Sequence, residues 1–163
     1  MKEVFRNLWV GSEDDVAKAE SKDMAILSAC KDGKTSHRGL LGYQNMGAPK
    51  SSSEYLVARR PNHLYLNLID GEDPSFVPDK LIDAALSFIT EHLGKNKPVF
   101  IHCVEGRSRS ASLALLWMYL NGKLPSDYHR AVKTFRTLYP DYDPANGIRQ
   151  YVKDRISAAK HRR

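Results

Sequence analysis

One short segment of the sequence combines residue types that can bind and transfer a phosphoryl group. It spans His102–Ser110 and reads HCVEGRSRS. Cys103 is a candidate nucleophile, and Arg109, six residues later, can hold two phosphate oxygens in a bidentate fork. Gly106 gives the backbone between them the freedom to curl, so that successive N–H groups can form an anion-binding nest. The spacing therefore predicts a phosphate-binding loop with a cysteine at its start.

The surroundings expected for this loop favour a reactive cysteine. The predicted helix that follows the loop directs its positive N-terminal end toward the anion, and Arg109 adds a full positive charge. Both effects favour the thiolate, so we expect Cys103 to be ionised near neutral pH. Ser110 can donate a hydrogen bond to the sulfur and ease its departure from phosphorus. The alternative, a structural cysteine beside an unrelated arginine, is disfavoured by the combination of flanking His, Gly and Ser.

The loop lies between two apolar segments that differ in length. Residues 98–102 form a short apolar stretch that is typical of a buried strand. Residues 111–120 are also mostly apolar, and their length indicates a helix buried at the centre of the domain. A junction of this kind, from a buried strand into a helix, brings backbone amides and the helix N-terminus to one anion.

The rest of the chain alternates between predicted strands and helices. Further strands are expected at 7–11, 24–30 and 64–69, and further helices after Ser12, from Pro78 to Gly94, at 126–138 and at 146–160. This alternation predicts an α/β fold whose central, mostly parallel sheet has about four to five strands, with helices on both faces. A chain of 163 residues is typical of one domain, so we expect a single domain over 1–163.

Residues 31–62 interrupt this alternation. The segment is rich in glycine and serine and shows little hydrophobic periodicity, so it is interpreted as an irregular insertion. Part of it, around Tyr55–Val57, is compatible with a strand.

The net charge of +6 lies entirely in the last quarter of the sequence. Residues 1–122 contain 15 basic and 15 acidic side chains, whereas residues 123–163 contain 10 basic and 4 acidic ones. This asymmetry excludes a uniformly basic protein, and aromatic and basic residues are not interleaved, so no nucleic-acid partner is expected. The basic end is interpreted as a helix C-terminus that complements its dipole, with docking to an acidic partner as the alternative.

Cysteine content and hydropathy limit the remaining classes. Cys30 and Cys103 are too few for a disulfide framework and match neither common zinc pattern, so no metal and no cofactor is expected. The longest apolar run, from Leu113 to Leu120, is too short for a membrane span, and the first residues do not form a signal peptide. These features predict an intracellular protein, cytoplasmic or nuclear, without a membrane span.

The loop sequence resembles the signature of the small dual-specificity phosphatases, which belong to the cysteine-based protein tyrosine phosphatase superfamily. Their signature is His-Cys, five residues, then Arg-Ser, and this chain retains it in full. Leu8–Ser12 is similar to the family's opening strand and turn, and Asp70 lies 33 residues before the cysteine, where the family has its general acid. Residues 144–148 resemble the family's Pro-Asn-x-Gly-Phe segment, with one difference in spacing and Ile148 in place of Phe. The resemblance does not extend to residues 31–62.

The resemblance implies a protein tyrosine phosphatase-like fold and a role for each matching residue. The family hydrolyses phosphotyrosine and phosphoserine or phosphothreonine in proteins through a cysteinyl-phosphate. Cys103 would be the nucleophile, Asp70 the general acid and then base, and Ser110 the partner of the sulfur. Phosphate would be held by Arg109 and by the loop residues Val104, Glu105, Gly106, Arg107 and Ser108, while His102 and Asn146 would support the site.

Several alternatives remain open at this level. Asp73 and Glu72 lie in the same turn as Asp70 and compete for the role of acid. Cys30 is interpreted as a small buried residue, although in some relatives of this fold a neighbouring cysteine forms a reversible disulfide with the nucleophile. Alternative functions are a phosphatase of phosphoinositides or other non-protein substrates, and a pseudophosphatase that binds phosphoproteins without hydrolysing them.

Overall fold

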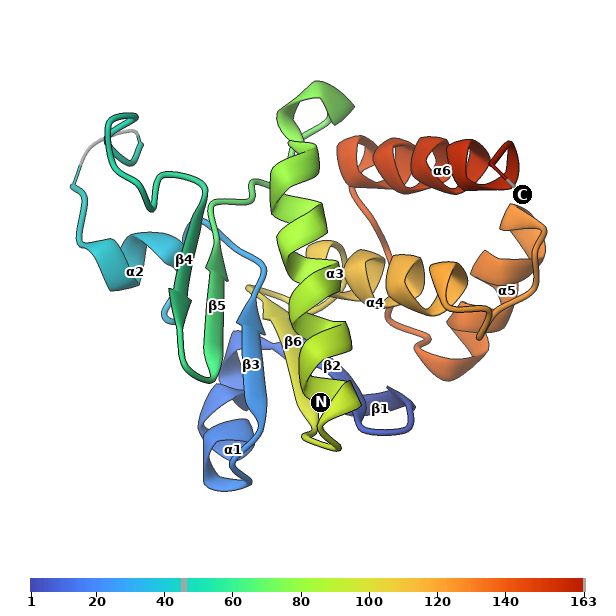
Figure 1. Ribbon diagram of the computed structural model, residues 1–163, viewed down its shortest axis with the longest axis horizontal. Coiled ribbons are helices and arrows are strands. Elements are labelled where there is room, and N and C mark those ends of the chain that lie inside the picture. Colours follow the sequence, from blue (N-terminus) through green and yellow to red (C-terminus); the bar gives the residue numbers. More distant parts are fainter. Residues whose placement is uncertain (45–46, 163) are drawn as a thin grey trace.

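A six-stranded mixed sheet organises the computed structural model, which describes residues 1–44 and 47–162 (Figure 1). The strands follow the order β1-β2-β6-β3-β5-β4. The four inner strands β2, β6, β3 and β5 are mutually parallel, and the edge strands β1 and β4 pair antiparallel to their neighbours. Their bounds are β1 Lys2–Phe5, β2 Leu8–Ser12, β3 Ala25–Ser28, β4 Val57–Arg60, β5 His63–Leu66 and β6 Val99–Cys103.

The predicted α/β class and the mostly parallel sheet are confirmed, whereas the predicted number of strands is wrong. The sheet has six strands instead of four to five because β1 was missed. Only Val4 of this strand is fully buried, so the sequence contains no apolar run or alternation that would indicate it. Asn7, with φ of 63°, makes the tight turn that pairs β1 with β2.

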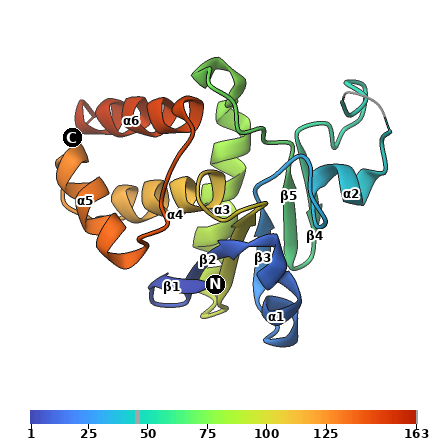
Figure 2. The same cartoon turned by 180° about the vertical axis from the view of Figure 1, so that it is seen from behind.

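Helices cover both faces of the sheet, as predicted. In Figures 1 and 2, α3 lies on one side of the sheet and α1 on the other, while α5 and α6 pack beyond α4. The helices are α1 Val16–Ser21, α2 His37–Leu41, α3 Asp79–Gly94, α4 Arg109–Leu120, α5 Tyr128–Leu138 and α6 Asn146–Lys160, with short 3-10 turns η1 Glu13–Asp15 and η2 Pro74–Phe76. Within the described ranges, no helix is long and apolar enough to cross a membrane.

Strand β6 lies at the centre of the sheet and is buried along its whole length. Val99 and Ile101 join the large core formed with α3 and α4, and Phe100 joins a smaller core beneath α1. Because side chains alternate along a strand, His102 lies on the α1 side. The strand therefore separates two cores and delivers Cys103 at its carboxyl end.

The segment 31–62 contains more regular structure than its composition indicates. It includes α2 and β4, and the strand expected near Tyr55–Val57 lies at Val57–Arg60. Asn45 and Met46, also in this segment, lie outside the described residues. Its first part contacts the segment before α1, because the Lys34 N–H donates to Glu13 Oε2 at 2.7 Å. It therefore borders the end of the sheet that carries Cys103.

Candidate active site

The predicted phosphate-binding loop connects β6 directly to α4. The strand ends at Cys103, and α4 begins at Arg109, two residues before the expected start. Periodicity alone could not find this start, because Arg109 and Ser110 are polar and interrupt the apolar pattern that follows. Both residues therefore lie in the first helical turn, where backbone N–H groups have no partner within the helix.

Gly106 is required by the packing of this loop as well as by its backbone conformation. Its φ is 78°, a region that residues with a side chain rarely adopt. A Cβ at this position would lie 2.6 Å from the carbonyl carbon of Gly11 and 2.7 Å from its oxygen. The Tyr139 hydroxyl donates to the Gly106 carbonyl at 2.8 Å. The loop is thus held between the end of β2 and the segment that follows α5.

The sulfur of Cys103 lies next to a buried hydroxyl. Ser110 Oγ is 3.2 Å from Cys103 Sγ and 3.5 Å from the Gly11 carbonyl, to which it can donate. A hydroxyl has one proton, so Ser110 stabilises negative charge on sulfur, the role expected for it, when that proton is directed to Sγ instead of to Gly11. Cys103 is 2% exposed and helps to line an open pocket, which gives access to the thiol.

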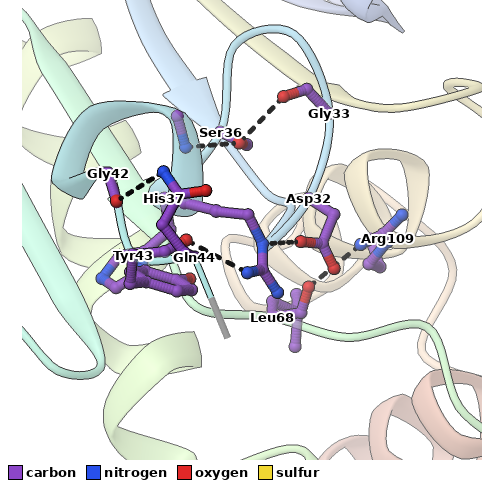
Figure 3. Close-up of polar contacts among 11 residues, drawn as sticks. Asp32, Gly33, Ser36, His37, Gly42, Tyr43, Gln44, Leu68 and Arg109 are labelled. Atoms are coloured by element: carbon purple, nitrogen blue, oxygen red, sulfur yellow. Dashed lines mark hydrogen bonds and ion pairs between the residues drawn. The ribbon is translucent and has the colours of Figure 1, made fainter. Parts of the chain in front are cut away.

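The guanidinium of Arg109 is anchored on one side only. Its Nη1 donates to the Leu68 carbonyl at 3.0 Å, as Figure 3 shows, and the Lys31 N–H donates to the same carbonyl at 2.9 Å. Its Nε is buried and has no hydrogen-bond partner among the described residues. Burying an N–H group without a hydrogen-bond partner costs free energy. A bound anion that accepts from the Arg109 Nε–H would remove this cost, so the unpaired N–H indicates an anion site.

The carboxylate of Asp70 is fixed at the rim of the same site. It follows β5 and accepts a hydrogen bond from the Ser108 hydroxyl at 2.7 Å. Ser108 Oγ in turn accepts from the Ala145 N–H at 2.9 Å. Ser108 therefore connects the acid to the segment that precedes α6. The sequence placed Ser108 in the phosphate loop but gave no signal for this bridge.

The competing acids have different environments. Asp73 caps η2 by accepting from the Ser75 N–H at 2.8 Å, and this hydrogen bond lowers the pKa of Asp73 below its ordinary value. The backbone of Glu72 is bound by α6, since Asn146 Nδ2 donates to the Glu72 carbonyl at 2.9 Å. Asp70 lines the same pocket as Cys103 and Arg109, whereas Glu72 and Asp73 are not among the residues that line it, so the geometry favours Asp70.

The start of α6 holds the acidic turn, residues 70–73, in place. The Gly147 N–H donates to the Gly71 carbonyl at 3.0 Å, beside the Asn146 bond. A Cβ on Gly147 would lie 2.4 Å from the Gly71 oxygen, so the two segments can approach only because residue 147 is glycine. This contact explains why residues 144–148 belong to the site although they lie 41 or more positions after Cys103.

These elements enclose one open pocket of about 560 Å³. Its walls are Asp70, Cys103, Val104, Glu105, Arg107, Ser108, Arg109, Asp143, Pro144 and Ala145. Gly106, Ser110 and Asn146 are not part of the wall, and their contacts lie behind it. His102, also outside the wall, is fully buried in β6. Asp143 was not expected; its N–H donates to the Arg107 carbonyl at 3.0 Å. Arg107 and Glu105 form a long, exposed ion pair of 3.7 Å on the rim.

Cys30 is the second thiol near this site, and it is sealed from solvent. It is fully buried, and its Sγ donates to the Thr35 carbonyl at 3.5 Å. Burial raises the pKa of Cys30 to about 12, against a smaller opposing effect of Arg109. Both cysteines are free in the structure. At neutral pH Cys30 is therefore a protonated thiol with little nucleophilic character.

Solved structures share this architecture over nearly the whole chain. Human DUSP28 superposes with a TM-score of 0.67 at 13% identity, covering 100% of both chains. DUSP15 superposes with a TM-score of 0.66 at 14% identity, covering 99% of this chain and 90% of the other. Human tyrosine phosphatase-like serine/threonine/tyrosine-interacting protein gives 0.64 at 13% identity, with 97% and 96% covered.

The chain has the dual-specificity phosphatase fold. The resemblance read from the loop sequence is thereby confirmed at the level of the fold. A curated relative, "Dual specificity protein phosphatase YVH1" of Plasmodium falciparum (isolate 3D7), is 32% identical over 82 residues, which are 50% of this chain. The match covers 14% of that relative's length. No family model matches the sequence.

Within this dual-specificity phosphatase fold, Gly106 offers a direct test of the loop geometry. We expect Gly106→Ala to lower the free energy of unfolding by about 2 kcal/mol, because the new Cβ collides with Gly11 and the positive φ is strained. The matched control is Gly94→Ala at the end of α3, where a Cβ meets nothing within 4 Å. Urea unfolding measures both variants, and an equal effect of the two substitutions would contradict the role of Gly106.

We also expect Cys30 to be inert toward oxidation. After peroxide treatment and dithiothreitol rescue, wild type and Cys30→Ser are expected to recover the same fraction of free Cys103 thiol, measured by mass spectrometry of the alkylated peptide. A protonated, buried thiol cannot readily attack an oxidised partner. Recovery that depends on Cys30 would show that it forms a regulatory disulfide after all.

Proposed function

We propose that residues 1–163 form one catalytic domain that hydrolyses phosphate monoesters of proteins through a cysteinyl-phosphate. The observation that carries the proposal is that Cys103, Arg109 and Asp70 line the same open pocket. Cys103 ends β6, Arg109 begins α4 and Asp70 lies in the turn after β5. Together they supply a nucleophile, an anion-binding cation and a proton donor. The dual-specificity phosphatase fold supports this combination.

In the first step, the Cys103 sulfur attacks phosphorus while the bond to the leaving oxygen breaks. The three equatorial oxygens are held by the loop N–H groups and by Arg109, whose Nη1 is already engaged and whose Nε–H has no other partner in the described part of the chain. The carboxyl group of Asp70 protonates the leaving oxygen. Its hydrogen bond to Ser108 fixes the direction of transfer.

In the second step, water attacks the phosphorus of the cysteinyl-phosphate. The Asp70 carboxylate, formed in the first step, accepts a proton from this water. The bond between phosphorus and sulfur breaks, inorganic phosphate leaves, and the sulfur departs as a thiolate. Ser110 Oγ, 3.2 Å from Sγ, stabilises the charge that returns to sulfur.

The shape and charge of the pocket favour phosphorylated side chains over highly anionic head groups. The residues beside the loop are Pro144 and Ala145, and no aromatic ring is found among the lining residues, so the walls do not select for a phenol. We therefore propose that phosphotyrosine and phosphoserine or phosphothreonine are accepted. Glu105 places a negative charge on the exposed rim and pairs with Arg107. This negative charge disfavours a polyphosphorylated lipid head group.

We expect Cys103→Ser to abolish hydrolysis of an aryl phosphate, with a loss of more than about 1,000-fold in kcat, because the hydroxyl is a far weaker nucleophile. Phosphotyrosyl and phosphothreonyl peptides, assayed by phosphate release under reducing conditions, extend the test to protein substrates. Cys30→Ser is the matched control and is expected to retain activity. Phosphopeptide binding by a wild type that releases no phosphate would instead identify a pseudophosphatase.

The assignment of the acid predicts different effects for two neighbouring carboxyl groups. We expect Asp70→Asn to lower kcat by about 100-fold or more for leaving groups of high pKa, with a smaller effect for good leaving groups. Asp73→Asn is expected to change kcat less than about threefold, because asparagine also caps a helix. Steady-state kinetics on a series of aryl phosphates measures both. Equal or reversed effects would contradict the role of Asp70.

A further inference from the structure

Three polar side chains form a continuous hydrogen-bonded chain across the sheet behind the phosphate loop. They come from neighbouring strands: His63 from β5, Ser28 from β3 and His102 from β6. Ser28 Oγ lies 2.7 Å from His63 Nε2 and 2.6 Å from His102 Nε2. His102 Nδ1 lies 3.2 Å from the Cys103 carbonyl oxygen. The chain therefore ends on the backbone of the candidate nucleophile.

The chemistry of these groups determines where each proton lies. A carbonyl oxygen only accepts, so His102 Nδ1 must carry the proton that it donates to the Cys103 carbonyl. A neutral imidazole has one N–H, so His102 Nε2 accepts, and the Ser28 hydroxyl must be its donor. Because a hydroxyl has one proton, Ser28 Oγ must accept from His63 Nε2–H. All three hydrogen bonds thus run in one direction, from His63 to Cys103.

Both histidines are neutral at physiological pH, as this assignment requires. Burial lowers the pKa of His63 to about 3 and that of His102 to about 4. Tyr65 stacks on the His63 ring with centroids 3.8 Å apart, and the positive charge of His102, when it is present, would also oppose protonation of His63.

The charged groups around His102 have opposite effects on its pKa. Phe100 stacks on its ring at 5.8 Å, Arg109 of α4 disfavours its protonation, and Asp15 of η1 favours it more weakly. Ser28 and His102 have no exposed surface, so water does not compete for the hydrogen bond between them. Because desolvation has the largest effect on the pKa of both His63 and His102, the neutral ring with one proton is the stable form of each.

We propose that Ser28 and His63 are positioning residues that fix the Nδ1–H tautomer of His102 and, through it, the peptide between Cys103 and Val104. In the opposite tautomer, a lone pair of Nδ1 would face the Cys103 carbonyl oxygen at 3.2 Å, and the two would repel. Because a trans peptide is planar, a carbonyl held toward His102 directs the Val104 N–H to the opposite side. The hydrogen bonds from His63 through Ser28 to His102 thereby fix the direction of the Val104 N–H, which is the first N–H of the phosphate loop.

The first experiment uses the wild-type protein and needs no turnover. Two-bond ¹H–¹⁵N correlation spectra distinguish the two tautomers of a neutral histidine. We expect the Nδ1–H form for His102 and the Nε2–H form for His63. An Nε2–H form of His102, or an Nδ1–H form of His63, overturns the proposal. The link to catalysis depends on the proposed function, but this measurement stands if the protein hydrolyses no phosphate ester.

The second experiment removes a member of the hydrogen-bonded chain and measures the reactivity of Cys103 and the tautomer of His102. In a Cys30→Ser background, the rate of iodoacetamide alkylation against pH reports only the Cys103 thiol. We expect Ser28→Ala to shift the midpoint of this profile upward by about half to one pH unit, the equivalent of one lost hydrogen bond. We also expect it to remove the preference of His102 for Nδ1–H. An unchanged midpoint together with an unchanged tautomer overturns the proposal.

Three further variants separate this role from a merely structural one. His63→Gln keeps an N–H that can donate to Ser28, so it is expected to retain the wild-type midpoint, whereas His63→Leu is expected to shift it in the direction of Ser28→Ala. Ser112→Ala removes another fully buried hydroxyl, from α4, and is expected to cause no shift. A shift in Ser112→Ala equal to that in Ser28→Ala would show a general effect of core damage and contradict the proposal.

Discussion

The site depends on the close contact between the loop after β6 and the end of β2. Strand β6 is hydrogen-bonded to parallel neighbours on both sides, so the position of Cys103 is fixed by the centre of the sheet. Gly106 then brings the loop against the Gly11 backbone, at a separation that leaves no room for a Cβ. The loop is therefore a rigid extension of the core, and the orientation of its N–H groups is determined by packing before any anion binds.

Much of the site could be predicted from the sequence because its central part is contiguous. Cys103, Gly106 and Arg109 lie within seven residues, and a strand before and a helix after them are readable from length and apolar pattern. The candidate general acid is harder to assign from the sequence, since Asp70 and Asp73 both lie in the same turn. The hydrogen bonds of Ser108 to Asp70 and of Ser75 to Asp73 distinguish them in the structure.

The features that could not be predicted depend on contacts between distant segments. Strand β1 has one fully buried residue, so its pairing with β2 leaves no hydrophobic signal. The bond from the Ala145 N–H to Ser108 joins segments 37 residues apart, and that between Ser28 and His102 joins segments 74 residues apart. A serine in a strand and a histidine before a cysteine each fit many environments. Only their register across β3 and β6 places them together.

The attachment of the acidic turn has a consequence for the time course of a reaction cycle. Ser108 holds the carboxylate of Asp70, and Asn146 and Gly147 hold the backbone of the residues that follow it. The proton donor that we propose is thus held at the pocket by these contacts alone, without closure of a flap. Under the proposed mechanism, turnover would be limited by chemistry or by the escape of phosphate, and solvent viscosity would affect only the encounter with substrate and that escape.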